Sequence, residues 1–443
     1  MSELASSLAE QFREHANKLP GAGQPRIVEM RERAFSQFEA NGVPTAKLED
    51  WKYTDTRALG DSNYIAINES DDLHSDAVQL SDLPLPEFTP HVAVFLDGEF
   101  CTRLSSLDAL PKGVNLTTIG PLLQQESAQI IGHMNNFDTA FPSLNTALLS
   151  DGVYVDLEPD TVLLEPLHVI FLVQRNDTPR LNTVRLIVVG KENSRGTIVE
   201  SHYCLDGAHS MTNAVTEIEA QQGANVVHHR IQIDEPAAHH IGNVFVSVGK
   251  DALVETNSFA FGGGITRIDV NADLIGAGGH VVLNGLFMVN GNQHIDHHTR
   301  VRHRVGHTYS SENYKGIADG EGRGVFNGKI LVEQDAQKIE ALQSSKNLLL
   351  SDGAEIDTKP ELEIYADDVK CAHGATVGQL DDDAFFYLRS RGIDEQSARS
   401  ILTFAFAADI SANIDIPPLR EWLERLIIER THATGINEIE NRD

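Results

Sequence analysis

"QQGANVV" (221–227), "GKDALVE" (249–255) and "GAGGHVV" (276–282) repeat one pattern: a turn residue, a small residue and then an apolar run. The turn residues recur at spacings of 28, 27, 28 and 29, by subtraction between Gly223, Asp251, Gly278, Gly306 and Asp335. A steady period of this length indicates a stacked solenoid, in which each coil buries its apolar face against the next. The sequence therefore predicts a parallel β-helix. An antiparallel sandwich or jelly roll is the alternative for so many short strands.

Helical patterns flank this β-rich part of the chain. Residues 1–150 are mixed and begin with a helical stripe, whereas residues 151–376 are short β-rich runs. Helical spacing returns in "DDDAFFYLRSRGI" (381–393), which opens with Asp caps. We expect an N-terminal helical and mixed domain over 1–150, a β-helix core over 151–376 and a C-terminal helical domain over 377–443.

The composition excludes several classes of partner. Asp and Glu total 65 against 35 Lys and Arg, a formal net charge of −30, which repels phosphate backbones and anionic lipid. We therefore expect no nucleic-acid or membrane partner. Three isolated cysteines without a CxxC pair argue against a disulfide framework, and no segment has 18 continuous apolar residues. The N-terminal region lacks the apolar centre of a signal peptide, so a reducing, cytoplasmic setting fits best.

"DDVKCAHGATVGQL" (367–380) places a thiol and an imidazole two residues apart in a predicted strand. Side chains repeat every two residues in a strand, so Cys371 and His373 should point the same way. The pair could be part of a metal site, a nucleophile with its base, or ordinary core packing. A zinc or iron–sulfur site normally needs four ligands, so any missing ligands must come from another subunit.

A second candidate lies in "NQHIDHHTRVRHRVGH" (292–307). His294 and Asp296, with the distant His373, resemble the two-His-one-carboxylate triad of non-haem iron oxygenases. Histidines on a polar sheet face are the competing interpretation. Alternating arginines in the same stretch disfavour a bound cation there.

Three stretches carry a resemblance to a known family. "NLLLSDGAEIDTKPELEIYADDVKCAHGAT" (347–376), "QHIDHHTRVRH" (293–303) and "PTAKLEDWKYTD" (44–55) resemble the SufB/SufD family, whose members are subunits of the Suf iron–sulfur cluster assembly system. Within the family, SufB-like sequences carry a cysteine in the strand around "LQSSKNLLL" and a His-Glu pair in the later strand. Here the first strand has no cysteine and the second reads His373-Gly374, so the chain is more similar to SufD.

The resemblance implies a fold, partners and a role. It implies a right-handed parallel β-helix in a complex of one SufB, one SufD and two copies of the ATPase SufC. The subunit would be a non-catalytic scaffold that binds no cofactor alone. A transient iron–sulfur cluster would be built at the SufB contact, with His373 and Cys371 facing SufB. ATP would be used by the SufC subunits of the complex, and reduced flavin is associated with the complex.

The resemblance also implies where SufC docks. Its candidate surface is the pair of C-terminal helices, through Phe385, Tyr387, Leu388, Arg391, Gly392, Ile401, Phe404 and Phe406. Two hypotheses of other classes stay open: a stand-alone non-haem iron oxygenase using the His-x-Asp…His triad, and a homodimer of the isolated chain paired through the edge of its β-helix.

Overall fold

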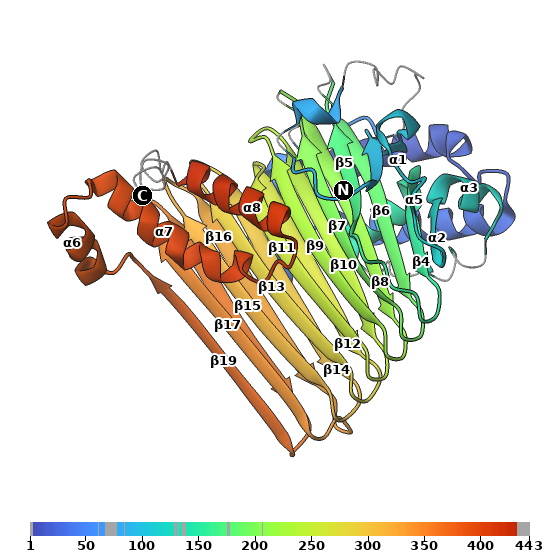
Figure 1. The fold of residues 1–443 in the computed structure, drawn as a ribbon. Coiled ribbons are helices and arrows are strands. Elements are labelled where there is room, and N and C mark those ends of the chain that lie inside the picture. Colours follow the sequence, from blue (N-terminus) through green and yellow to red (C-terminus); the bar gives the residue numbers. More distant parts are fainter. Residues whose placement is uncertain are drawn as a thin grey trace.

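The chain folds into a parallel β-helix with helices at both ends (Figure 1). A computed structural model describes residues 3–431, apart from 61, 67–77, 84, 128–129, 131–132, 135–138, 175–177 and 206. Each coil gives one strand to each of two facing sheets, and successive strands within a sheet pair in parallel. The predicted parallel β-helix is thereby confirmed, and the antiparallel sandwich is excluded.

The two sheets, called sheet A and sheet B, take alternate strands of the chain. Sheet A contains β3 (Val114–Thr118), β4 (Asp151–Leu157), β6 (Arg180–Gly190), β8 (Ser210–Ala220), β10 (His239–Val248), β12 (Ile265–Leu274), β14 (His294–His303), β16 (Arg323–Val332) and β18 (Glu355–Ile364). Sheet B contains β1 (His91–Leu96), β2 (Glu99–Phe100), β5 (Leu167–Val173), β7 (Arg195–Cys204), β9 (Asn225–Asp234), β11 (Leu253–Gly262), β13 (His280–Val289), β15 (Tyr309–Ala318), β17 (Ile339–Leu349) and β19 (Val369–Gly378).

One corner of each coil is made by a residue with positive φ. These residues have φ between 54° and 77° and are Asp160, Asn193, Gly223, Asp251, Gly278, His307 and Lys338. The backbone N–H of each such residue donates to a carbonyl of the next coil, as from Gly223 to Lys250 at 2.9 Å. Gly, Asn and Asp tolerate this left-handed conformation best, and the predicted turn residues Gly223, Asp251 and Gly278 are such corners. Near the other two predicted turn residues, Gly306 and Asp335, the corners are instead His307 and Lys338. At Gly278 the coils also approach closely, since a Cβ there would lie 2.1 Å from the Asp251 carboxylate.

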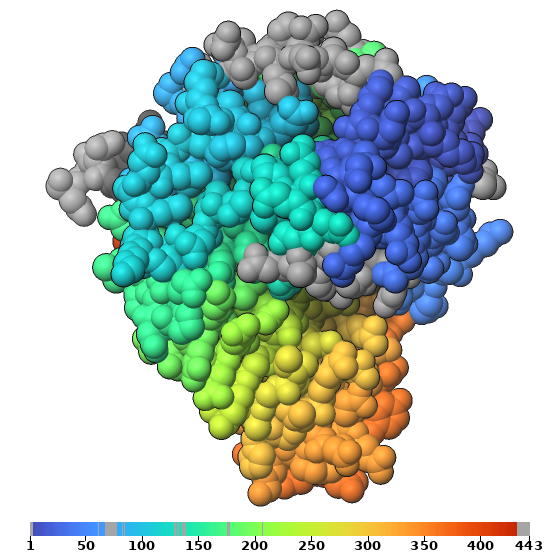
Figure 2. Space-filling model, turned by 90° about the vertical axis from the view of Figure 1, so that its right-hand side faces the viewer, coloured from blue at the N-terminus to red at the C-terminus, as the bar shows by residue number. Residues whose placement is uncertain are grey.

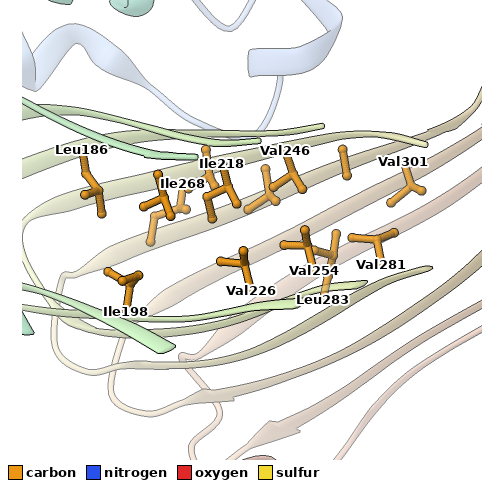
Figure 3. Close-up of a cluster of buried hydrophobic side chains, with 14 of the residues drawn as sticks. Leu186, Ile198, Ile218, Val226, Val246, Val254, Ile268, Val281, Leu283 and Val301 are labelled. Atoms are coloured by element: carbon orange, nitrogen blue, oxygen red, sulfur yellow. The ribbon is translucent and has the colours of Figure 1, made fainter. Parts of the chain in front are cut away.

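The main core fills the space between the sheets. Apolar side chains of both sheets point inward at alternate positions of the strands and stack in rows along the coils. Figure 3 shows the two sets facing each other, with Leu186, Ile218, Val246, Ile268 and Val301 from sheet A opposite Ile198, Val226, Val254, Val281 and Leu283 from sheet B. Because the strands pair in register, each row continues from coil to coil.

The N-terminal segment covers one end of the solenoid (Figure 2). Its helices are α1 (Glu3–His15), α2 (Pro25–Asn41), α3 (Ile119–Gln124) and α5 (Ala140–Leu148). Phe12 of α1 and Phe35 of α2 stack at a centroid distance of 4.3 Å in a second core that reaches residues of sheet A. At the same end β2 pairs antiparallel with β1 and β3 pairs antiparallel with β4, so the first coil is closed by short strands and helices.

Three C-terminal helices follow the last strand: α6 (Asp382–Ser390), α7 (Glu395–Ser411) and α8 (Pro417–Arg430). The predicted cap of α6 is present, because the side chain of Asp381 accepts from the backbone N–H of Ala384, and Asp394 caps α7 in the same way through Ser397. Helices α7 and α8 pack on sheet B through a separate apolar cluster. The division at residues 150 and 376 stays a prediction, since nothing in the fold shows that the three segments fold as separate units.

Candidate functional site

The solenoid ends on two edge strands. β18 pairs only with β16, and β19 only with β17, among the residues that the structure describes. We call this pair of edges, β18 and β19, the open end. An edge strand presents unpaired backbone N–H and C=O groups, which another chain can pair with. Side chains are also exposed here, as at Val377, which is 43% exposed.

Cys371 and His373 lie at the open end and share one row. Their partners on β17 are Ala341 and Gln343, and both partners are buried. The predicted common orientation of the pair therefore agrees with the register. Cys371 is half-buried against the main core, and burial raises the pKa of its thiol. His373 is exposed at the rim.

The proposed oxygenase triad does not form. The Asp296 carboxylate is already occupied by Arg267 at 3.0 Å, Thr54 at 2.5 Å and His298 at 3.0 Å. Burial opposes its ionisation, but His298 and Arg267 outweigh burial and lower its pKa. Within the described part of the chain, no three His, Cys, Asp or Glu side chains form a group that could hold a metal ion. The triad prediction was wrong because the carboxylate serves a buried ion pair.

Two of the stretches that carried the resemblance contact each other. Thr54 belongs to "PTAKLEDWKYTD" and its hydroxyl is 2.9 Å from the ring of His294 as well as bonded to Asp296. The guanidinium carbon of Arg267 lies 3.8 Å from the ring centroid of Trp51, which belongs to the same stretch. These contacts fasten the N-terminal segment to the outer face of sheet A, so this motif is structural.

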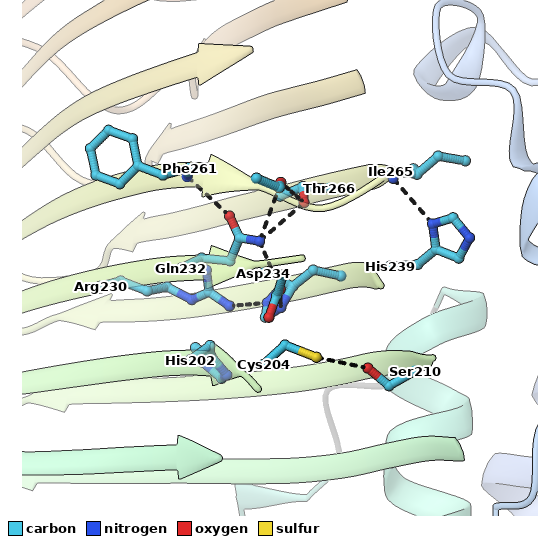
Figure 4. A network of polar contacts seen from close by, with 12 residues as sticks. His202, Cys204, Ser210, Arg230, Gln232, Asp234, His239, Phe261, Ile265 and Thr266 are labelled. Carbon is cyan, nitrogen blue, oxygen red and sulfur yellow. Dashed lines mark hydrogen bonds and ion pairs between the residues drawn. The ribbon is translucent and has the colours of Figure 1, made fainter. Parts of the chain in front are cut away.

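The remaining histidines of the central coils form buried networks (Figure 4). Glu200 contacts His202 at 2.6 Å and His228 at 2.9 Å, and Thr216 of sheet A donates to the same carboxylate. Arg230 lies 2.6 Å from His240. Burial lowers the pKa of His202 to about 4, so its ring is neutral at physiological pH. These buried histidines therefore satisfy buried polar groups, whereas His280 and His307 are exposed.

Near the open end the interior carries a further polar group, which the sequence analysis missed. Gln343, Ser345 and Asn347 of β17 all point inward and are buried. We call these three residues the polar row. Behind it Glu312 of β15 is also buried, and burial raises the pKa of its carboxyl to about 7. The alternation in "LQSSKNLLL" was the available signal, because Gln343, Ser345 and Asn347 stand at every second position and so share one face of a strand.

The C-terminal helices expose the residues predicted to bind a partner to different degrees. Helix α6 has no buried residue; Tyr387 on it is 54% exposed and Phe386, which the sequence analysis did not select, is 73% exposed. The other candidates divide into two groups. Phe385, Leu388, Ile401, Phe404 and Phe406 are half-buried, and Arg391 and Gly392 are exposed in the turn after α6. Helix α7 buries one side on sheet B and leaves the other half-covered.

Comparison with known proteins identifies the class. The family described as "SUF system FeS cluster assembly, SufBD core domain" matches residues 171–406, and "SufBD protein N-terminal region" matches residues 2–169. The chain belongs to the SufBD family of iron–sulfur cluster assembly proteins.

The similar proteins in this family include two that are named SufD. The iron–sulfur cluster assembly protein SufD of Escherichia coli is 32% identical over 85% of this chain and 86% of its own length. The SufBD family protein slr0076 of Synechocystis is 31% identical, over 91% of each chain. SufD of Bacillus subtilis is 25% identical over 64% of this chain and 65% of its own length. The chain is thus a homologue of SufD. None of the helices in its described residues has the length and hydropathy needed to span a membrane.

Proposed function

We propose that this chain is a SufD-type scaffold subunit that docks through its open end onto a SufB paralogue and helps to build iron–sulfur clusters at that contact. The observation that carries the proposal is the exposed His373 on β19, at the open end of the solenoid. Pairing of β18 and β19 with the equivalent edges of a paralogue would satisfy the exposed backbone groups. The subunit itself would be non-catalytic and cytoplasmic.

His373 would supply one incomplete half of the assembly site. Neutral imidazole is a good ligand for iron, and one histidine leaves the cluster without its other ligands until the partner subunit provides them. A cluster held this way is released when the contact opens, whereas a closed four-thiolate site would retain it. Cys371, with its half-buried thiol of raised pKa, is the weaker ligand and contributes mainly packing.

SufC would dock on the C-terminal helices, giving a complex of one SufB, one chain of this protein and two SufC. Exposed Phe386 and Tyr387 on α6 support that docking, since large aromatic side chains are the usual anchors of protein interfaces. ATP turnover in SufC would then move the two scaffold subunits relative to each other and open the contact. Reduced flavin would act in the assembled complex.

The test is the variant His373→Ala, expressed in a strain that depends on the Suf system under iron limitation. We expect iron–sulfur enzyme activities to fall at least about tenfold, the lower bound for losing even an indirect metal partner. Native mass spectrometry should still show the 1:1:2 complex. His280→Ala, which removes an exposed histidine from the start of β13, is the matched control. Normal cluster supply in the His373 variant would contradict the proposed function.

A further inference from the structure

Three side chains of sheet B form a column that ends at the open end. Glu312 of β15 pairs in register with Gln343 of β17, which pairs with His373 of β19. Adjacent strands are about 4.8 Å apart, so in-register side chains of one row lie one strand spacing apart. The column therefore leads from a buried carboxyl group, through a buried amide, to an exposed imidazole.

Contacts inside the coil fix the orientation of the Gln343 amide. Its Nε2 donates to Glu312 Oε1 at 3.3 Å, and Thr299 of sheet A donates to the other oxygen of Glu312. The amide nitrogen is thus directed back into the solenoid. Gln343 Oε1 is buried and has no hydrogen-bond partner among the described residues. A buried acceptor without a donor costs free energy, and the next side chain in the column is His373.

The coil is shaped around this amide. Gly328 of β16 faces Gln343 across the interior, and a Cβ at that position would lie 2.3 Å from Gln343 Nε2. The same Cβ would also lie 2.8 Å from the ring of Phe326. Glycine at 328 therefore leaves the space that the amide occupies.

We propose that Gln343, held by Glu312, is a positioning residue for His373. Its carbonyl oxygen, which has no partner among the described residues, would accept a ring N–H of His373 when the ring turns toward it, and this would leave the other ring nitrogen as an unprotonated lone pair aimed at the partner. Metal-binding histidines usually donate their second ring N–H to an acceptor of this kind, which fixes the tautomer. The inference rests on the proposed function of His373.

The first test measures the ring itself in the full chain. Ring-¹⁵N-labelled histidine reports the tautomer of His373 by NMR at a fixed pH of about 8, where an ordinary histidine is neutral. His373→Ala identifies the signal. We expect one dominant tautomer in the wild type and a shift toward the mixture of free imidazole in Gln343→Met, which preserves volume, and in Gly328→Ala, which displaces the amide. An unchanged tautomer in folded Gln343→Met would overturn the proposal.

The matched control is Ser345→Ala. Ser345 belongs to the same polar row but pairs with Ala375 and bonds to Thr358 at 3.1 Å, so it should leave the His373 tautomer unchanged. A tautomer shift in the Ser345 variant as large as in Gln343→Met would mean that the loss of any polar side chain from the polar row changes the His373 tautomer. That result would overturn the specific assignment to Gln343.

The second test is cluster supply under iron limitation. Gln343→Met should lower iron–sulfur enzyme activities about tenfold, and adding it to His373→Ala should lower them no further, because both act through one group. Additive losses would overturn the positioning role. Normal supply in His373→Ala, together with a tautomer that changes in Gln343→Met, would instead contradict the proposed function and leave the positioning intact.

Discussion

Several buried titratable residues of this protein take their neutral forms, whereas, despite burial, contacts with histidines hold the pKa of Glu200 and of Asp234 below its usual range. Burial lowers the pKa of His168, His229 and His297 to about 3, and it raises the pKa of Glu312 to about 7. Both shifts have the same cause, since a low-dielectric interior disfavours the charged form of either group. The interior near the open end can therefore be polar without carrying a fixed charge.

The Glu312 carboxyl makes stability depend on pH. Its folded pKa of about 7 lies above the ordinary value of 4.5, so the native state binds more protons between these values. The stabilisation is complete below pH 4.5 and is lost as the pH rises through 7. Glu312→Gln removes this titration. We expect the variant to gain stability over the wild type as the pH rises from 5 to 8, by up to about 3 kcal/mol, measured by denaturant unfolding.

The control for that experiment is Glu340→Gln, which makes the same chemical change at an exposed position of β17. It accounts for the loss of one negative charge from a chain of net charge −30. A difference between Glu312→Gln and the wild type that stays constant from pH 5 to 8 would show that the buried carboxyl does not titrate in this range.

At the scale of elements, α6 differs from the other C-terminal helices. Its cap at Asp381 fixes where it starts, yet the helix buries no residue against the solenoid and projects beyond the last coil (Figure 1). Its two most exposed aromatic residues, Phe386 and Tyr387, lie next to each other. A helix with this arrangement is suited to contact with another chain.

Phe386→Asp tests α6 as the SufC-binding element. We expect the affinity for SufC to fall about tenfold or more, since an aromatic anchor is replaced by a charge that must be desolvated. Isothermal titration calorimetry with purified SufC measures the change. The matched control is Leu164→Asp, which alters a residue that is 88% exposed before β5. Equal SufC affinity for wild type and Phe386→Asp would exclude this helix face.

At the scale of the whole molecule, the two ends of the solenoid are unlike. The antiparallel pairs β1–β2 and β3–β4 and the N-terminal helices cover the first coils. The last coil ends on β18 and β19, each of which pairs on one side only among the described residues. This asymmetry gives the protein one end at which pairing with another solenoid is open. In the absence of a SufB paralogue, we expect the isolated chain to pair with a second copy there.

Val377→Asp should abolish that self-association, because it places a charge in the inward row of the edge strand β19. Analytical ultracentrifugation should show a dimer for the wild type and a monomer for the variant. The wild-type dimer should tighten with added salt, since each copy carries a net charge of −30. Ile275→Asp alters a residue with similar exposure, 49% against 43%, outside the open end. Dimers that persist in Val377→Asp would exclude the open end as the contact.

Local features of the fold could be predicted from the sequence, but the contacts of the candidate site could not. The coil period follows from single residues that adopt positive φ. The Asp caps of α6 and α7 each accept a hydrogen bond from a backbone N–H only three residues further along the chain. The oxygenase triad was wrong because spacing along β14 does not show that Thr54, 242 residues away from Asp296, already occupies that carboxylate. Phe386 was missed because a helical pattern does not tell which side remains uncovered.

The sequence by itself determined the parallel β-helix, the helix caps and the shared row of Cys371 and His373, because backbone conformation and side-chain alternation are set by neighbouring residues. Only the tertiary structure decided what lies behind His373. Stacking of coils about 30 residues apart brings Glu312, Gln343 and His373 into one column, and it buries the first two while leaving the third at the rim. Burial and register between coils are properties of the whole stack, which no single strand contains.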